Sequence, residues 1–276
     1  MTIQALQFSF IGGGNMASAL IGGLLHAGVP HTALNVIERN PQTREALLQQ
    51  FSIQSSASPN QQLSHCDVII LAVKPQQFHA MSVQLQPYIQ QQLLFSVAAG
   101  IRLDTMQMWF NDHKRIVRAM PNTPTLIGAG MTGLVATSTL SAEDRDIATQ
   151  IAQAVGDSLW VKDDAQIDAL TALSGSGPAY VFYLIEAMQA AGIALGLNAT
   201  QSKRLITSTL IGAAQLAQQS DETPEQLRQR VTSPGGTTFE ALHVLETHQV
   251  KEVFQKALAA AAARSAEIGE TLAHSK

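Results

Sequence analysis

Short apolar segments alternate with segments of helical spacing along the first part of the chain. The apolar segments cover residues 6–11, 34–37, 68–73, 93–98, 115–120 and 131–136. Residues 68–73 are almost continuously apolar, which is typical of a strand buried on both faces of a parallel sheet. We expect helices over residues 15–25, from Pro41 onward and after Ser141, where Asp144 completes an N-cap pattern. The alternation predicts an α/β domain over residues 1–163.

Residues 164–276 lack such strand patterns and predict a second domain that is entirely helical. Residues 198–201 and 223–226 have capping-box spacing, Pro178 and Pro224 suit first helical positions, and Gly192 is expected to end a helix. Stretches such as residues 205–217 are apolar nearly all round, and so small a domain cannot bury them alone. We therefore expect these helices to interdigitate with a second subunit.

Composition supports association and narrows the classes of partner. The 276 residues are 46% hydrophobic and only 14% charged, so part of the surface is expected to lie under other subunits. The net charge of -4 gives no basic footprint for nucleic acid. The single Cys66 excludes an intramolecular disulfide, and no spaced Cys/His set predicts a metal site. Without a signal peptide or an apolar run of about 18 residues, neither secretion nor membrane insertion is expected, and the cytoplasm is the predicted location.

A glycine-rich motif lies where the first predicted strand turns into a helix. It has the GxGxxA pattern and consists of Ile11, Gly12, Gly13, Gly14, Asn15, Met16 and Ala17. Gly12 permits the tight turn, Gly14 lets the backbone approach a pyrophosphate, and the helix N-terminus attracts the anion. The motif predicts a Rossmann-type dinucleotide-binding domain.

Two residues at the end of the second predicted strand bear on the choice of dinucleotide. Glu38 could accept hydrogen bonds from the ribose hydroxyls of NAD, whereas Arg39 could pair with the 2'-phosphate of NADP. An arginine at a strand tip is a ready phosphate ligand, and Glu38 could turn outward on the alternating strand. We therefore favour NADP (NADPH), and NAD (NADH) stays an alternative.

Further cofactor contacts are expected where neighbouring strands end, because ligands of open parallel sheets lie outside the carboxyl ends of the strands. Residues 120–124 form a proline-stiffened loop that we expect near the nicotinamide. The other expected contacts follow the strands at 68–73 and 93–98, and they are Ala72, Val73, Lys74, Pro75, Ala98, Ala99 and Gly100.

Two glycine-rich loops in the helical part each precede a helix. The first starts at Ser174, and the second comprises Ser233, Pro234, Gly235, Gly236, Thr237 and Thr238. Thr237 with Glu240 has capping-box spacing, and the free amides of the second loop could hold a small carboxylate. Neither loop contains a strong general acid or base, which alcohol oxidation normally requires. Imine reduction is less demanding, since a hydroxyl such as that of Thr238 can hydrogen-bond the nitrogen.

The segments IGGGNM, VKP, MPNTP, LSGSGPAY and VTSPGGTT, in this order, closely resemble the pyrroline-5-carboxylate reductase family. The resemblance implies that NAD(P)H delivers hydride to C5 of 1-pyrroline-5-carboxylate, giving L-proline in the last step of proline biosynthesis. It implies Thr238 as the catalytic hydroxyl and places the substrate on the two glycine-rich loops. The expected substrate-binding residues are Ser174, Ser233, Gly235, Gly236, Thr237 and Thr238.

The resemblance also bears on the cofactor site and on assembly. It implies that residues 12–16, 72–75 and 98–100 contact the cofactor, and Asn60 matches an asparagine near the adenosine ribose. The family forms homodimers through an all-α C-terminal dimerisation and substrate domain. Often five dimers make a decameric ring, and each active site lies between one subunit's first domain and its partner's second.

Two other functions stay open at this point. A 2-hydroxy-acid dehydrogenase of similar two-domain type should carry a Lys or His in the helical-domain motif, and residues 233–238 contain neither. A non-catalytic nucleotide-sensing module need not retain the second anion-binding loop. The intact loop therefore favours the reductase over both alternatives.

Overall fold

The computed structural model describes residues 2–273, which form two compact units. The first unit runs to Ser176 and also includes the chain from Ala261 onward, and the second is Gly177–Ala260. The last helix, α11 (Val250–Ala273), therefore contributes to both units. The domain division at residue 163 stays a prediction.

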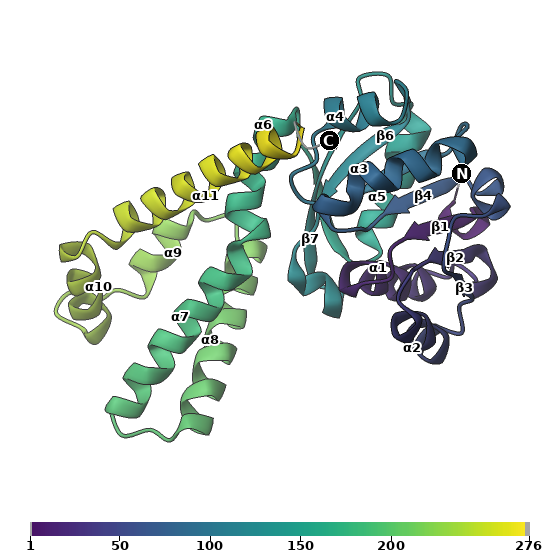
Figure 1. Ribbon diagram of the computed structural model, residues 1–276. Helices are drawn as coiled ribbons and strands as arrows, with labels where there is room; N and C mark the ends of the chain where they lie inside the picture. The colour runs from purple at the N-terminus through teal and green to yellow at the C-terminus, as the bar shows by residue number, and fades with distance from the viewer. Residues whose placement is uncertain (1, 274–276) are drawn as a thin grey trace. The chain divides into compact units, whose positions relative to one another are not determined.

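The first unit is built on one eight-stranded sheet with the order β3-β2-β1-β4-β5-β6-β7-β8 (Figure 1). All neighbouring strands are parallel except β6 and β7. This confirms a Rossmann-type sheet. The strands are β1 (Phe8–Ile11), β2 (Leu34–Ile37), β3 (Ser55–Ser56), β4 (Val68–Leu71), β5 (Leu93–Ser96), β6 (Ile116–Met120), β7 (Gly130–Ala136) and β8 (Gly156–Trp160).

Helices cover both faces of the sheet because its central strands bury side chains on both sides. One core cluster includes Phe10, Ile70 and Leu20 and involves α1 (Asn15–His26), α2 (Pro41–Phe51) and α5 (Ala142–Gln153). The other includes Ile69, Phe78 and Trp109 and involves α3 (Pro75–Leu85) and α4 (Leu103–Trp109). Short 3-10 helices join these elements: η1 (Ile3–Ala5), η2 (His31–Ala33), η3 (Gln61–His65), η4 (Gln86–Tyr88) and η5 (Thr123–Ile127).

The sheet differs from the expectation at its edges. β3 and β8 were not predicted, because two serines and the sequence GDSLW lack the apolar pattern of a buried strand. An edge strand has one unpaired side and needs less apolar surface. β7 is antiparallel to β6 because the connecting residues 121–129 are too few for a helical crossover.

Within the described residues, the chain from Asp164 to Ala273 is helical, as expected. The elements are α6 (Asp164–Leu170), the π-helix η6 (Thr171–Gly175), α7 (Gly177–Ala194), α8 (Ala199–Gln219), α9 (Pro224–Arg230), α10 (Thr237–Thr247) and α11. The predicted N-cap at Ser141 and the capping boxes at Asn198 and Thr223 are confirmed. Pro224 is the first residue of α9, whereas Pro178 is the second residue of α7.

Two predicted helix boundaries are wrong. Gly192 lies inside α7, where a Cβ atom would come within 2.8 Å of the Ser202 hydroxyl of α8, so it permits close helix packing. Gly196, at φ +95°, follows the end of α7 instead. Thr237 is the first residue of α10 rather than its cap, since Gly236 holds the N-cap position.

The helices of the second unit expose much apolar surface. Phe182 is 62% exposed and Tyr183 is 75% exposed, and among the described residues α7, α9 and α10 contain no buried side chain. Such helices lack the buried stripe that normally stabilises a helix in water. Across residues 2–273, none of the helices is both long and apolar enough to cross a membrane.

Candidate active site

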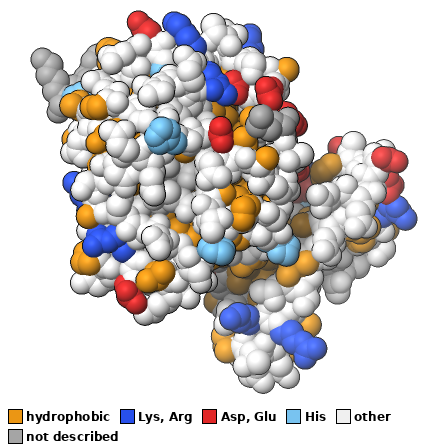
Figure 2. All heavy atoms as spheres, turned by 90° about the vertical axis from the view of Figure 1, so that its right-hand side faces the viewer, with side chains coloured by type: hydrophobic (Ala, Val, Ile, Leu, Met, Phe, Trp, Pro, Cys, Tyr) orange, Lys and Arg blue, Asp and Glu red, His pale blue; other side chains and the backbone are white. Residues whose placement is uncertain are grey.

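A cleft of about 770 Å³ opens at the carboxyl ends of β1, β2 and β4. The predicted cofactor residues that line it are Ile11, Gly12, Gly14, Arg39, Ala72, Val73 and Lys74. Charged side chains on the face drawn in Figure 2 occur singly or in small mixed groups, in keeping with the low charged fraction. Because its lining residues follow β1, β2 and β4, the cleft lies where an open parallel sheet binds its ligand.

The glycine-rich turn at this cleft has the geometry of an anion cradle. Gly12 has φ +95°, and a Cβ there would lie 2.7 Å from the Ala72 carbonyl oxygen. Its amide donates to the Ile37 carbonyl at 2.8 Å, which ties the turn between β1 and α1 to the end of β2. Gly14 is the N-cap of α1, and a Cβ there would meet none of the described atoms within 4 Å. The first-turn amides of α1 can therefore approach a pyrophosphate closely.

The two residues at the end of β2 differ in their surroundings. Glu38 accepts hydrogen bonds from the amides of Gly13 at 2.8 Å and Asn40 at 2.7 Å. The expectation that Glu38 turns outward is therefore wrong, because both carboxylate oxygens bind backbone. Arg39 is exposed at the edge of the cleft, and Arg44 donates to the carbonyl oxygens of both Glu38 and Arg39.

The loop after β6 contacts both the glycine-rich turn and the first glycine-rich loop of the helical part. The Asn122 amide group donates to the carbonyl and hydroxyl oxygens of Ser174, both at 3.2 Å. Its side-chain oxygen accepts from the Met131 amide at 2.9 Å, so Asn122 ties the loop after β6 to β7 as well as to Ser174. The Thr125 hydroxyl lies 3.7 Å from the Met16 sulfur. The structure thus brings the segments GGGNM, MPNTP and LSGSG together.

The loop of residues 233–238 belongs to the second unit and leads from α9 into α10. Gly235 has φ +66°, and the Gly236 amide donates to the Ser233 carbonyl at 3.0 Å. In the described structure no side chain caps α10, and Thr238 is its half-buried second residue. The amides of this first turn form an uncapped helix N-terminus, which suits a carboxylate.

Comparison with known proteins identifies the family. The model for pyrroline-5-carboxylate reductase dimerisation matches residues 164–268, and that for coenzyme F420-dependent NADP oxidoreductases matches residues 7–100. The pyrroline-5-carboxylate reductase of Pseudomonas aeruginosa is 42% identical, covering 96% of this chain and 98% of the relative. This chain belongs to the pyrroline-5-carboxylate reductase family.

Solved structures of such reductases have the same fold. The reductase of Coxiella burnetii has a TM-score of 0.89 at 39% identity, covering 95% of this chain and 98% of that chain. That of Plasmodium falciparum, described with NADP bound, has a TM-score of 0.87 at 29% identity, covering 97% and 100%. The resemblance seen in the sequence is confirmed, and the helical region of this reductase matches a dimerisation domain.

Some predicted cofactor residues of the reductase lie outside the lining of the cleft. Asn60 caps η3 by accepting from the Gln62 amide at 3.0 Å, and it borders a separate cavity of about 500 Å³. Gly13 donates to Glu38, and Pro75 begins α3. Asn15 and Met16 begin α1, and residues 98–100 follow β5. Their roles toward a dinucleotide stay predictions.

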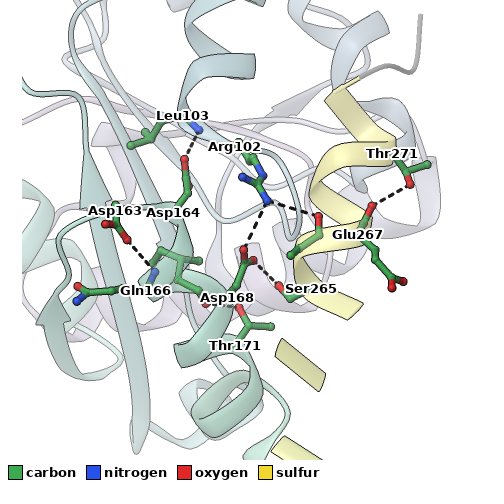
Figure 3. A network of polar contacts seen from close by, with 12 residues as sticks. Arg102, Leu103, Asp163, Asp164, Gln166, Asp168, Thr171, Ser265, Glu267 and Thr271 are labelled. Carbon is green, nitrogen blue, oxygen red and sulfur yellow. Dashed lines mark hydrogen bonds and ion pairs between the residues drawn. The ribbon is translucent and has the colours of Figure 1, made fainter. Parts of the chain in front are cut away.

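The structure also contains a polar network that the sequence analysis missed (Figure 3). Asp168 accepts from the Ser265 hydroxyl at 2.7 Å and lies 3.7 Å from the Arg102 guanidinium. Beside it, Asp164 forms an ion pair with Arg118, a 2% exposed residue of β6, and accepts from the Leu103 amide. A charged residue inside the otherwise apolar strand segment IVRAM is the signal that could have predicted an acidic partner.

Proposed function

We propose that this reductase converts 1-pyrroline-5-carboxylate to L-proline with NADPH as hydride donor and with NADH as a second donor. The observation that carries the proposal is an anion-binding cleft at a Rossmann-type glycine turn in a chain whose second glycine loop also forms an uncapped helix N-terminus. The names of the family relatives support the same substrate. The reaction is the last step of proline biosynthesis.

The first unit holds the dinucleotide, which when bound supplies the hydride. The Gly14 amide and the first-turn amides of α1 hold the pyrophosphate, and Gly12 supplies the tight turn that brings them to the cleft. Arg39 pairs with the 2'-phosphate of NADPH, because its side chain is exposed at the cleft, whereas both oxygens of Glu38 accept backbone hydrogen bonds. The other predicted contacts are Ile11, Gly13, Asn15, Met16, Asn60, Ala72, Val73, Lys74, Pro75, Ala98, Ala99 and Gly100.

The loop before α10 holds the substrate. The amides of Thr237 and Thr238 bind the carboxylate, helped by Ser174, Ser233, Gly235 and Gly236, whose own amide holds the loop by donating to the Ser233 carbonyl. The Thr238 hydroxyl hydrogen-bonds the imine nitrogen. As hydride forms the new bond at C5, the C=N π pair moves to this nitrogen, which already carries a proton taken from water. The reaction therefore requires no carboxylate or imidazole in the loop, and residues 233–238 contain none.

The active unit is a homodimer formed through the helical domain of residues 164–276, and the dimers assemble into a decamer. The exposed apolar side chains of α7, α8 and α10 support such an interface. The dinucleotide domain then comprises residues 1–163. The single cysteine favours the reducing cytoplasm as the location.

A direct absorbance assay of cofactor oxidation tests the proposal. Purified protein is mixed with 1-pyrroline-5-carboxylate and either NADPH or NADH, and cofactor oxidation is followed. Substrate-dependent oxidation is expected with both cofactors, with NADPH preferred. Its absence with both would overturn the proposal. Oxidation of 2-hydroxy acids with NADP or NAD would favour the dehydrogenase instead.

Thr238→Ala tests the role of the hydroxyl. It should lower kcat at least tenfold with little change in NADPH affinity, since the hydroxyl contacts the substrate. Thr247→Ala is the matched control, because Thr247 lies at the other end of α10 and its hydroxyl donates to the His243 carbonyl. Equal kcat values for the two variants would remove Thr238 from the mechanism.

A further inference from the structure

Glu38 connects three parts of the dinucleotide cleft through backbone hydrogen bonds. It follows β2, and its Oε2 accepts from the Gly13 amide in the glycine-rich turn at 2.8 Å. Its Oε1 accepts from the amide of Asn40, the N-cap of α2, at 2.7 Å. Both oxygens of one carboxylate are thus used to hold the turn and the start of α2 against the tip of β2.

The bond to Gly13 explains how the three consecutive glycines are oriented. Gly12 and Gly14 line the cleft, whereas Gly13 does not belong to its described lining. The Gly13 amide points to the carboxylate, and a Cβ on Gly13 would lie 2.8 Å from Leu47 Cδ1 of α2. The middle residue is therefore fixed from two sides, and this holds Gly14 and the start of α1 at the cleft.

The two hydrogen bonds that Glu38 accepts are of the charge-assisted kind. Two N–H donors stabilise an ionised acceptor more than a neutral amide or acid, since charge-assisted hydrogen bonds are the stronger class. Arg44 adds rigidity by donating to the carbonyl oxygens of Glu38 and Arg39, each at 2.9 Å. Each oxygen of this carboxylate is therefore engaged with a backbone amide.

We propose that Glu38 is a positioning residue for the pyrophosphate-binding turn and does not select between NADPH and NADH. The inference rests on the dinucleotide binding included in the proposed function. If it holds, Glu38 affects every ligand that carries a diphosphate, and the choice between the two dinucleotides is left to Arg39. A carboxylate that bound the ribose would instead affect NADH and NADPH in opposite directions.

Glu38→Gln separates these two possibilities. The amide keeps the shape of the side chain but can accept from only one of the two backbone N–H groups and places its own NH₂ against the other. Dissociation constants are measured by calorimetry for ADP, NADH and NADPH. We expect all three to rise about tenfold, with the ratio of NADPH to NADH affinity unchanged within about twofold. Glu45→Gln on α2, whose exposed carboxylate accepts from Gln49, is the matched control and should leave all three constants unchanged.

Two results would overturn the positioning role: weaker NADH with tighter NADPH, or unchanged ADP affinity in a variant of wild-type thermal stability. Should Glu38→Gln not fold, Glu38→Asp keeps the charge on a shorter stem and is judged by the same ratio. The Michaelis constant for 1-pyrroline-5-carboxylate should stay at the wild-type value, since Glu38 acts on the nucleotide. If the wild-type protein binds nucleotides but does not turn over the imine, the proposed function fails while the binding comparison still decides the role of Glu38.

Discussion

Substituting the two cleft-lining glycines with alanine should separate the folding of the glycine-rich turn from its binding of phosphate. Gly12→Ala places a methyl group 2.7 Å from a backbone oxygen at φ +95°, a conformation that alanine rarely adopts. Gly14 has φ -70° and ψ -173°, which alanine adopts freely, and the described structure leaves its Cβ position open. The first change should therefore harm the fold, and the second should harm only ligand binding.

The magnitudes follow from these contacts. Backbone strain at Gly12 costs about 1–3 kcal/mol, and the close contact adds to it, so the thermal midpoint should fall by roughly 5–10 °C. At Gly14, the loss of an N-cap glycine is offset by the reduced entropy of the unfolded chain, and the net change should stay within about 1 kcal/mol. A methyl group that displaces the diphosphate from one charge-assisted hydrogen bond costs about 1.5–3 kcal/mol of binding free energy. This weakens binding by about ten- to a hundredfold.

Thermal unfolding without ligand and calorimetric titration with NADPH measure the two effects. Gly22→Ala in the same helix is the control, because its Cβ would meet the Phe51 ring at an ordinary 3.6 Å. It should bind NADPH as tightly as the wild type and keep or slightly raise the thermal midpoint, because alanine favours a helix interior more than glycine does. The reasoning is refuted if Gly14→Ala binds NADPH as tightly as the wild type, or if its midpoint falls as far as that of Gly12→Ala.

Three further predictions concern groups away from the cleft. Burial by itself raises the pKa of Asp144, but hydrogen bonds from Arg115 and the N-cap hydroxyl together lower it below its usual value. Its stabilisation is therefore present above about pH 4 and is lost as pH falls through the folded pKa. Asp144→Asn should thus cost about 2 kcal/mol in urea unfolding at pH 7 and clearly less near pH 3. An equal cost at both pH values would contradict this. Burial raises the pKa of Cys66 to about 11. At pH 8, alkylation of this thiol should therefore be about two hundredfold slower in the folded protein than in the unfolded chain. Comparable alkylation rates would show that folding does not raise this pKa. Asp164→Asn leaves the Arg118 cation buried without its counter-charge and should destabilise the protein by about 3 kcal/mol. The double variant Arg118→Met with Asp164→Leu removes both charges and should recover most of that loss. If the double variant recovers none of it, the unpaired buried charge is not the cause of the destabilisation.

The sequence predicted the central sheet well because burial on both faces leaves a continuous apolar record. β4 and β5 pair in register from Val68 with Leu93 to Leu71 with Ser96, and all of these residues are buried. Helix starts were equally readable where a side chain caps backbone amides, as at Asn198. Such features depend on residues close together in the chain, so a single sequence contains them.

The parts that could not be predicted depend on partners distant in the sequence. Gly192 resembled a helix end, but it is small because Ser202 of the next helix packs against it. Glu38 resembled a ribose ligand, since nothing in its neighbourhood along the chain indicates that the Gly13 amide would point at it. Three-dimensional contacts decide such cases, and the local pattern is the same for both outcomes.

In the helical unit, the sequence predicts apolar helix surfaces correctly but does not specify what covers them. A helix with apolar residues on most of its surface is equally consistent with burial inside one chain and burial between chains. The structure of one chain distinguishes these cases, because Phe182 and Leu195 are 62% and 86% exposed at well-formed helical or helix-end positions. Exposed side chains of this size on a folded scaffold indicate a surface completed by association. Since the matched dimerisation model spans residues 164–268, the low charged fraction and the apolar helices have one physical explanation, a surface that association covers. In the proposed homodimer, the stability of this unit should then rise with protein concentration.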